Sequence, residues 1–126
     1  WVKNNLSNPA VRILDARAPQ FYSGAEQGRM PRAGRIPGAQ NIPFSSLVEE
    51  SNNFKSANVL RDLFSHAEVK PKTTVATYCH IGQQASLLYF VARYLGYDAH
   101  VYDGSFEEWS SKPELPVEKT KSPSPN

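Results

Sequence analysis

Apolar and polar residues follow one another along the chain in blocks that predict strands and helices in alternation. Short runs suited to strands cover residues 11–14, 39–42, 73–78 and 99–102. Apolar residues at helical spacing predict helices over residues 2–7, 47–51, 57–66, 83–95 and 104–110. Because strands alternate with helices, the pattern favours an α/β domain with a mostly parallel sheet.

Signals at the helix ends sharpen this prediction. Ser56 is placed to cap the helix that begins after it, and Ser45 or Ser46 can cap the shorter helix before that. The 83–95 helix has the most complete apolar face, and Gly96 stands where a glycine commonly ends a helix.

Glycine and proline mark two segments outside the predicted elements. Four of the seven glycines lie in residues 24–38 together with Pro31 and Pro37, which predicts a long irregular loop of the kind that is usually functional or disordered. Residues 119–126 are polar and proline-rich and lack apolar anchors, which predicts a disordered tail. The predicted folded domain therefore covers residues 1–118.

Length and composition exclude several classes of protein. A chain of 126 residues suits one compact domain. A net charge of +2 is too small to indicate a nucleic-acid interface, and no stretch is long and apolar enough to predict a membrane span. One cysteine excludes an internal disulfide or a multi-thiolate zinc site, and the scattered histidines lack ligand spacing. We therefore expect no nucleic-acid partner, no membrane, no metal and no cofactor.

The one cysteine, Cys79, lies at a joint that can activate a thiol. The strand over residues 73–78 ends directly before it, and a helix begins near Gln83. Ligands of open α/β sheets bind at the carboxyl ends of strands, and a helix N-terminus stabilises a thiolate. Gly82 allows a tight turn that aims main-chain N–H groups inward. A lone cysteine after a strand is also commonly a small buried hydrophobe, so both interpretations stay open.

Four motifs follow one another along the chain. They are DAR at 15–17 followed by FYSG at 21–24, GRIPGAQNIP at 34–43, CHIGQQ at 79–84 followed by Ala85, and YDGSF at 102–106 with Trp109. In this order and spacing they resemble the rhodanese-type sulfurtransferase domain of the thiosulfate and 3-mercaptopyruvate sulfurtransferases, along roughly residues 11–109. The resemblance implies a catalytic domain whose sheet is flanked by helices on both faces.

The resemblance also implies a double displacement. The Cys79 thiolate would take the sulfane sulfur of a small-molecule donor, thiosulfate or 3-mercaptopyruvate, and the resulting persulfide would pass it to a thiol or to cyanide. The implied cradle for that sulfur consists of the main-chain N–H groups of the loop, namely those of His80, Ile81, Gly82, Gln83, Gln84 and Ala85. Asp15 and Arg17 resemble the family's structural pair, in which a carboxylate and an arginine support the loop. The alternative for that pair is an ordinary salt bridge that contributes little.

The loop departs from the family at positions that bear on the donor. Thiosulfate-preferring members carry cations after the cysteine and mercaptopyruvate-preferring members carry small neutral residues, whereas this chain has His80 and Ile81. Arg32 matches one carboxylate-binding arginine of the mercaptopyruvate branch, but the second falls at Phe21. As a cluster, three arginines of the 24–38 loop could draw anions inward, although each alone is typical of a solvated charge. They are Arg29, Arg32 and Arg35.

Three further hypotheses remain. The first six residues resemble the opening of the second domain of tandem sulfurtransferases, which predicts a C-terminal catalytic domain partnered by an N-terminal rhodanese-like domain of the same chain. The neutral loop favours, as an alternative, a non-catalytic module or a protein-to-protein sulfur relay. A thiolate phosphatase or arsenate reductase needs an arginine to close a longer loop, and Ala85 stands at that place.

Overall fold

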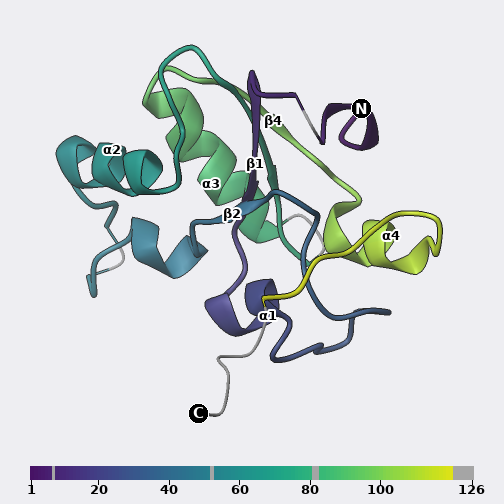
Figure 1. The fold of residues 1–126 in the computed structure, drawn as a ribbon. Coiled ribbons are helices and arrows are strands. Elements are labelled where there is room, and N and C mark those ends of the chain that lie inside the picture. Colours follow the sequence, from purple (N-terminus) through teal and green to yellow (C-terminus); the bar gives the residue numbers. More distant parts are fainter. Residues whose placement is uncertain (7, 52, 81–82, 121–126) are drawn as a thin grey trace, which may run out of the picture.

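A four-stranded sheet forms the centre of the domain in a computed structural model, which describes residues 1–6, 8–51, 53–80 and 83–120 (Figure 1). Its strands lie in the order β2-β1-β3-β4, and all three neighbouring pairs are parallel. The strands are β1 (Val11–Asp15), β2 (Gln40–Asn41), β3 (Thr74–Tyr78) and β4 (Asp98–Val101). The parallel sheet confirms the fold class that the alternating pattern predicts.

The strand order creates a switch point at the centre of the sheet. From β1 the chain continues to β2 on one side, whereas from β3 it continues to β4 on the other. In the register between the two central strands, Asp15 lies opposite Tyr78, so both strands end at the same level. Open α/β sheets bind their ligands where connections diverge in this way. The fold therefore brings the residue after β3, Cys79, beside the end of β1.

Helices cover both faces of the sheet (Figure 1). On one face, α2 (Ala57–His66) and α3 (Gln83–Tyr94) pack on Leu14 and Val75 in a core that includes Phe64 and Leu88. On the other face, α4 (Ser105–Ser111) packs on the remaining strand residues in a second core. Its buried members include Ile13, Ile36, Tyr78, Phe106 and Trp109. The period-two alternation of strand side chains separates the two cores.

Two helices confirm the end signals of the sequence. Helix α2 has the predicted bounds, and the Ser56 hydroxyl accepts a hydrogen bond from the Val59 N–H at 3.4 Å. Helix α3 ends one residue before the predicted limit, and Gly96 follows with a φ of 97° in the left-handed region. Local capping rules therefore account for both of the longer helices.

Other local predictions are wrong. The predicted 47–51 helix does not form; a short 3-10 helix, η2 (Phe44–Leu47), lies before it and ends at Leu47. Val48 is extended and pairs in an antiparallel bridge with Phe54, which removes it from any helix. The helix over residues 2–7 shrinks to a 3-10 helix, η1 (Lys3–Asn5), with Ser7 outside the described residues.

The long loop and the tail differ in detail from the prediction. A short helix that the pattern did not predict, α1 (Pro19–Ser23), begins with a proline in its first turn and leads into the loop. Of the predicted tail, residues 121–126 lie outside the described part. Thr120 donates its main-chain N–H to the Ser23 carbonyl at 2.9 Å, so the chain lies against the domain up to that residue.

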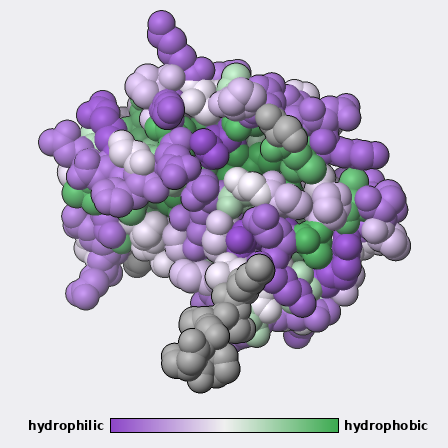
Figure 2. Space-filling view, viewed as in Figure 1, coloured by the Kyte–Doolittle hydropathy of each residue, from purple (hydrophilic) through white to green (hydrophobic). Residues whose placement is uncertain are grey.

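The surface shown in Figure 2 is mainly hydrophilic, with smaller hydrophobic areas between the polar side chains. Among the described residues, no helix has both the length and the apolar character needed to cross a membrane. Most of the large apolar side chains of the described residues are buried in the two cores, which agrees with this hydrophilic surface.

Candidate active site

Cys79 lies at the carboxyl end of β3, before the start of α3, and is 1% exposed. Its Sγ accepts a hydrogen bond from the Ala85 N–H at 3.3 Å. This N–H belongs to the first turn of α3, where main-chain N–H groups have no partner within the helix. Both the hydrogen bond and the positive end of the helix favour negative charge on the sulfur.

Helix α4 holds the main chain of Cys79 from the other side. The Cys79 N–H donates to the Ser105 hydroxyl at 3.1 Å, and that hydroxyl donates to the Tyr102 carbonyl at 2.9 Å. The Phe106 N–H donates to the Cys79 carbonyl at 2.9 Å, and the Glu107 N–H donates to the His80 carbonyl at 3.0 Å. The first residues of α4 therefore fix the peptide groups on both sides of the sulfur-bearing residue.

His80 follows Cys79 and is partly buried. Its ring meets the Phe21 ring edge to face, with 4.7 Å between the ring centroids. Burial lowers the pKa of His80 below its ordinary value of 6.5, and the nearby Arg17 charge lowers it further, against a smaller opposing effect of Asp15. At neutral pH His80 is therefore an uncharged ring.

The rest of the predicted cradle is described in part. Ile81 and Gly82 lie outside the described residues, and for Gln83 only the main chain is described. Gln84 is partly buried, and its Oε1 atom is buried with no hydrogen-bond partner among the residues that the structure describes. Of the six predicted N–H groups, Ala85 is the one for which the described geometry gives a contact to sulfur. Binding of donor sulfur by any of these six N–H groups stays a prediction.

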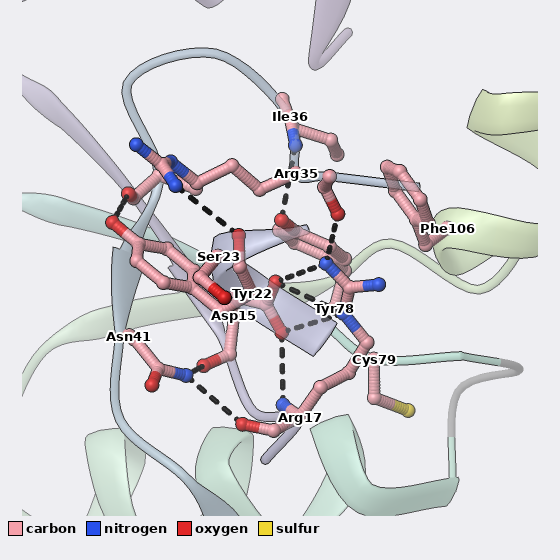
Figure 3. Close-up of polar contacts among 12 residues, drawn as sticks. Asp15, Arg17, Tyr22, Ser23, Arg35, Ile36, Asn41, Tyr78, Cys79 and Phe106 are labelled. Carbon is pink, nitrogen blue, oxygen red and sulfur yellow. Dashed lines mark hydrogen bonds and ion pairs between the residues drawn. The ribbon is translucent and has the colours of Figure 1, made fainter. Parts of the chain in front are cut away.

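Asp15 and Arg17 form a buried ion pair at the end of β1 (Figure 3). Arg17 Nη2 lies 2.7 Å from Asp15 Oδ2, and its Nε donates to both carboxylate oxygens at 3.0 Å. Burial opposes the charge of Arg17, but the hydrogen bond and the charge of Asp15 outweigh it and raise the pKa of the guanidinium. The Arg17 guanidinium therefore stays ionised beside the Asp15 carboxylate.

The pair supports the site through its neighbours. Arg17 donates to the Gly34 carbonyl at 2.6 Å and lies 4.3 Å from the centroid of the Phe106 ring. Tyr78 completes this network by accepting the Ile36 N–H at 3.1 Å (Figure 3). Among the described contacts, neither Asp15 nor Arg17 bonds directly to the main chain of the Cys79 loop. The pair instead joins the 24–38 loop to α4, which holds Cys79.

Arg32 makes structural hydrogen bonds at the end of α4. Its guanidinium donates to the carbonyls of Ser110, Lys112 and Leu115 at 2.7–2.9 Å, around the end of α4. Cys79 contacts the opposite end of that helix, so the described contacts do not bring Arg32 together with the sulfur. Its role in donor binding stays a prediction. Arg35 is also engaged, with Glu118 and Thr120, whereas Arg29 is exposed.

Sequence reasoning did not single out two residues of this site. Ser105 stood within the YDGSF motif, but its contact with Cys79 depends on how α4 docks. Thr77 belongs to a strand that was predicted for its β-branched and aromatic content, and its hydroxyl donates to the Ala85 carbonyl at 2.9 Å. Within the described residues, no group of three His, Cys, Asp or Glu side chains is arranged to hold a metal ion.

Comparison with known proteins agrees with this architecture. The sequence profile described as Rhodanese-like domain matches residues 1–112. The chain belongs to this family of rhodanese-like domains. Together with the parallel sheet and the cysteine at the end of β3, the match supports the resemblance stated from the four motifs.

Relatives and solved structures carry names from sulfur metabolism. The chain is 38% identical over 117 residues to the sulfur carrier protein TtuD of Thermus thermophilus, covering 85% of this chain and 41% of that protein. It is 32% identical over 126 residues to thiosulfate/3-mercaptopyruvate sulfurtransferase 1, mitochondrial, of Arabidopsis thaliana, covering 98% and 33%. The anaerobic ergothioneine biosynthesis enzyme of Chlorobium limicola superposes with a TM-score of 0.87 at 26% identity, covering 96% and 31%. The chain thus spans less than half the length of these proteins.

Proposed function

We propose that this domain is a sulfurtransferase that carries sulfur as a persulfide on Cys79. The observation that supports the proposal most directly is the Ala85 N–H at 3.3 Å from Cys79 Sγ, at the start of α3. A persulfide places its negative charge on the outer sulfur, which needs hydrogen-bond donors around it. The first turn of α3 supplies such donors without any charged side chain.

The chemistry proceeds in two displacements. The Cys79 thiolate attacks the sulfane sulfur of thiosulfate or the thiol sulfur of 3-mercaptopyruvate and forms an S–S bond. With thiosulfate, the old S–S bond breaks and sulfite leaves with its electron pair. With 3-mercaptopyruvate, the C–S bond breaks and the thiol proton passes to the carbon that becomes the methyl group of pyruvate. An acceptor thiol or cyanide then takes the outer sulfur and releases the Cys79 thiolate.

Mass spectrometry of the intact chain tests this proposal. After incubation with thiosulfate or 3-mercaptopyruvate, we expect Cys79 to gain the mass of one sulfur atom and to lose it on addition of thiol or cyanide. The Cys79→Ser variant should gain nothing. Absence of the gain with both donors at every pH from about 6 to about 9, a range that includes the ordinary pKa of a cysteine thiol, would contradict the proposal in this form.

A second candidate is a relay that accepts sulfur from a protein persulfide. Two observations favour it. Arg32 and Arg35 are engaged by main-chain and side-chain oxygens, so they contribute less to an anion clamp than the sequence suggests. One relative is named a sulfur carrier protein. Sulfur gain from a protein persulfide, but from neither small donor, would select this alternative. A partnership with an N-terminal rhodanese-like domain also stays a proposal.

A further inference from the structure

Thr77 lies in β3, two residues before Cys79, and is fully buried. Side chains two residues apart in a strand point to the same face of the sheet. For Thr77 and Cys79 this is the face that α3 covers, because Val75 and Cys79 both belong to the core cluster of that face. A hydroxyl is thus buried directly beside the site of the proposed sulfur chemistry.

The Thr77 hydroxyl contacts the same residue that contacts the sulfur. Its Oγ1 donates to the Ala85 carbonyl at 2.9 Å, and the Ala85 N–H donates to Cys79 Sγ at 3.3 Å. Ala85 is itself fully buried, so neither bond competes with bulk water. The strand therefore holds Ala85 at its carbonyl, while the N–H of the same residue reaches the sulfur.

Packing alone does not require a hydroxyl here. Valine has nearly the same shape as threonine and an equal preference for strands, and it carries no polar atom that must find a buried partner. The carbonyl of a helix residue already accepts one N–H of the helix. Its second lone pair therefore needs no further donor. The hydroxyl adds a fixed distance between the end of β3 and the first turn of α3.

We infer that Thr77 is a positioning residue, whose hydroxyl fixes Ala85 so that its N–H points at Cys79 Sγ. The inference rests on the proposed function, because positioning Ala85 matters for sulfur transfer only if Cys79 carries the sulfur. Loss of the hydroxyl lets the first turn of α3 move away from the sulfur. The Ala85 N–H then stabilises the thiolate less.

Two variants separate the hydroxyl from the shape of the side chain. Thr77→Val keeps the shape and removes the hydroxyl, whereas Thr77→Ser keeps the hydroxyl and removes a methyl group. The readout is the ultraviolet absorbance of the thiolate against pH, with the Cys79→Ser variant subtracted. In Thr77→Val we expect the titration to move to higher pH by about half a unit, as one hydrogen bond to the charged form weakens. In Thr77→Ser it should stay at the wild-type position.

Sulfur loading is the second readout. At a pH below the midpoint measured for the wild-type thiolate, we expect the persulfide to form about threefold more slowly in Thr77→Val than in wild type, in line with the smaller thiolate fraction. A Thr77→Val titration that coincides with wild type overturns the inference, and so does an equal shift in Thr77→Ser. If Thr77→Val does not fold, Thr77→Ala against Thr77→Ser repeats the comparison, because these two also differ by one hydroxyl.

The thiolate titration keeps this inference separate from the proposed function. If the Cys79 thiolate of the wild-type chain forms as the pH rises but the chain never gains sulfur from any donor, the proposed function fails. The positioning of Ala85 is still decided by whether Thr77→Val shifts the titration. If the wild type gains sulfur and the Thr77→Val titration is unchanged, the proposed function stands and the inference about Thr77 falls.

Discussion

Individual side chains around Cys79 act mainly through the main chain. Ser105 has a φ of 50°, an unfavourable region for a residue with a Cβ atom, yet it is fully buried. In this conformation its hydroxyl accepts the Cys79 N–H and donates to the Tyr102 carbonyl. Since the Cys79 N–H is already bonded in this way, it is not free to bind donor sulfur. The proposed cradle would therefore begin after Cys79.

His80 makes the stability of the domain depend on pH. Because burial lowers its pKa in the folded chain, the unfolded chain binds the proton more tightly. As the pH falls below about 6.5, the ordinary histidine pKa, the free energy of unfolding should decrease. This contribution is fully lost only below the lowered pKa of the folded state. We expect His80→Gln to remove it.

Urea unfolding of both proteins at several pH values measures this effect. His66 and His100 are present in wild type and variant alike, so the difference between the two pH profiles isolates His80. Toward acidic pH, wild type should lose stability relative to His80→Gln, so the difference between the two free energies of unfolding should change across this range. Profiles that stay parallel from neutral to acidic pH would show that His80 does not couple to folding.

Among the helices and strands, those with local signals were predictable from the sequence. Helix α2 combines an apolar face with the Ser56 cap, and α3 ends at Gly96, so periodicity and end signals agree. The 47–51 helix failed because Val48 pairs with Phe54, a contact that outweighs a weak local preference. Helix α1 was missed because five residues are too few for a periodic pattern.

Gly96 offers a direct test of the end of α3. Its φ is 97°, and a Cβ built there meets no atom within 4 Å. Gly96→Ala should therefore destabilise the domain by about 1 kcal/mol through backbone strain alone, without a clash. Gly96→Asn should cost less, because asparagine tolerates the left-handed region better. Chemical denaturation of the three proteins checks this order, and equal stability of the alanine variant would contradict it.

At the scale of the whole domain, the position of the candidate site can be predicted from the sequence, whereas many contacts around it cannot. The joint between β3 and α3 follows from local pattern, and so does the position of Cys79 within it. The contacts of Arg32 do not follow from local pattern, because its partners Ser110 and Leu115 lie about 80 residues further along the chain. In the folded chain the Arg32 guanidinium donates to main-chain carbonyls around the end of α4, and its part in anion binding stays a prediction. Such long-range hydrogen bonds leave no periodic signal in the sequence.

The Asp15–Arg17 pair tests how the parts of the domain depend on one another. It lies at the end of β1 and reaches the 24–38 loop through Gly34 and α4 through Phe106. Asp15→Asn leaves a buried guanidinium without its counter-charge, which should cost about 3–5 kcal/mol. Arg17→Met leaves a buried carboxylate and should cost a similar amount. Both losses should appear in the free energy of unfolding.

The double variant Asp15→Leu with Arg17→Met decides whether these losses come from the pair itself. Removing both charges leaves neither one buried alone, so the combined loss should be smaller than the sum of the two single losses, by about 2 kcal/mol or more. A double-mutant cycle in denaturant measures this difference, with Asp15→Leu as the second single variant. Additive losses would mean that each residue acts through separate contacts. A coupled result would mean that the ion pair itself stabilises the domain, at the place where its contacts join β1, the long loop and α4.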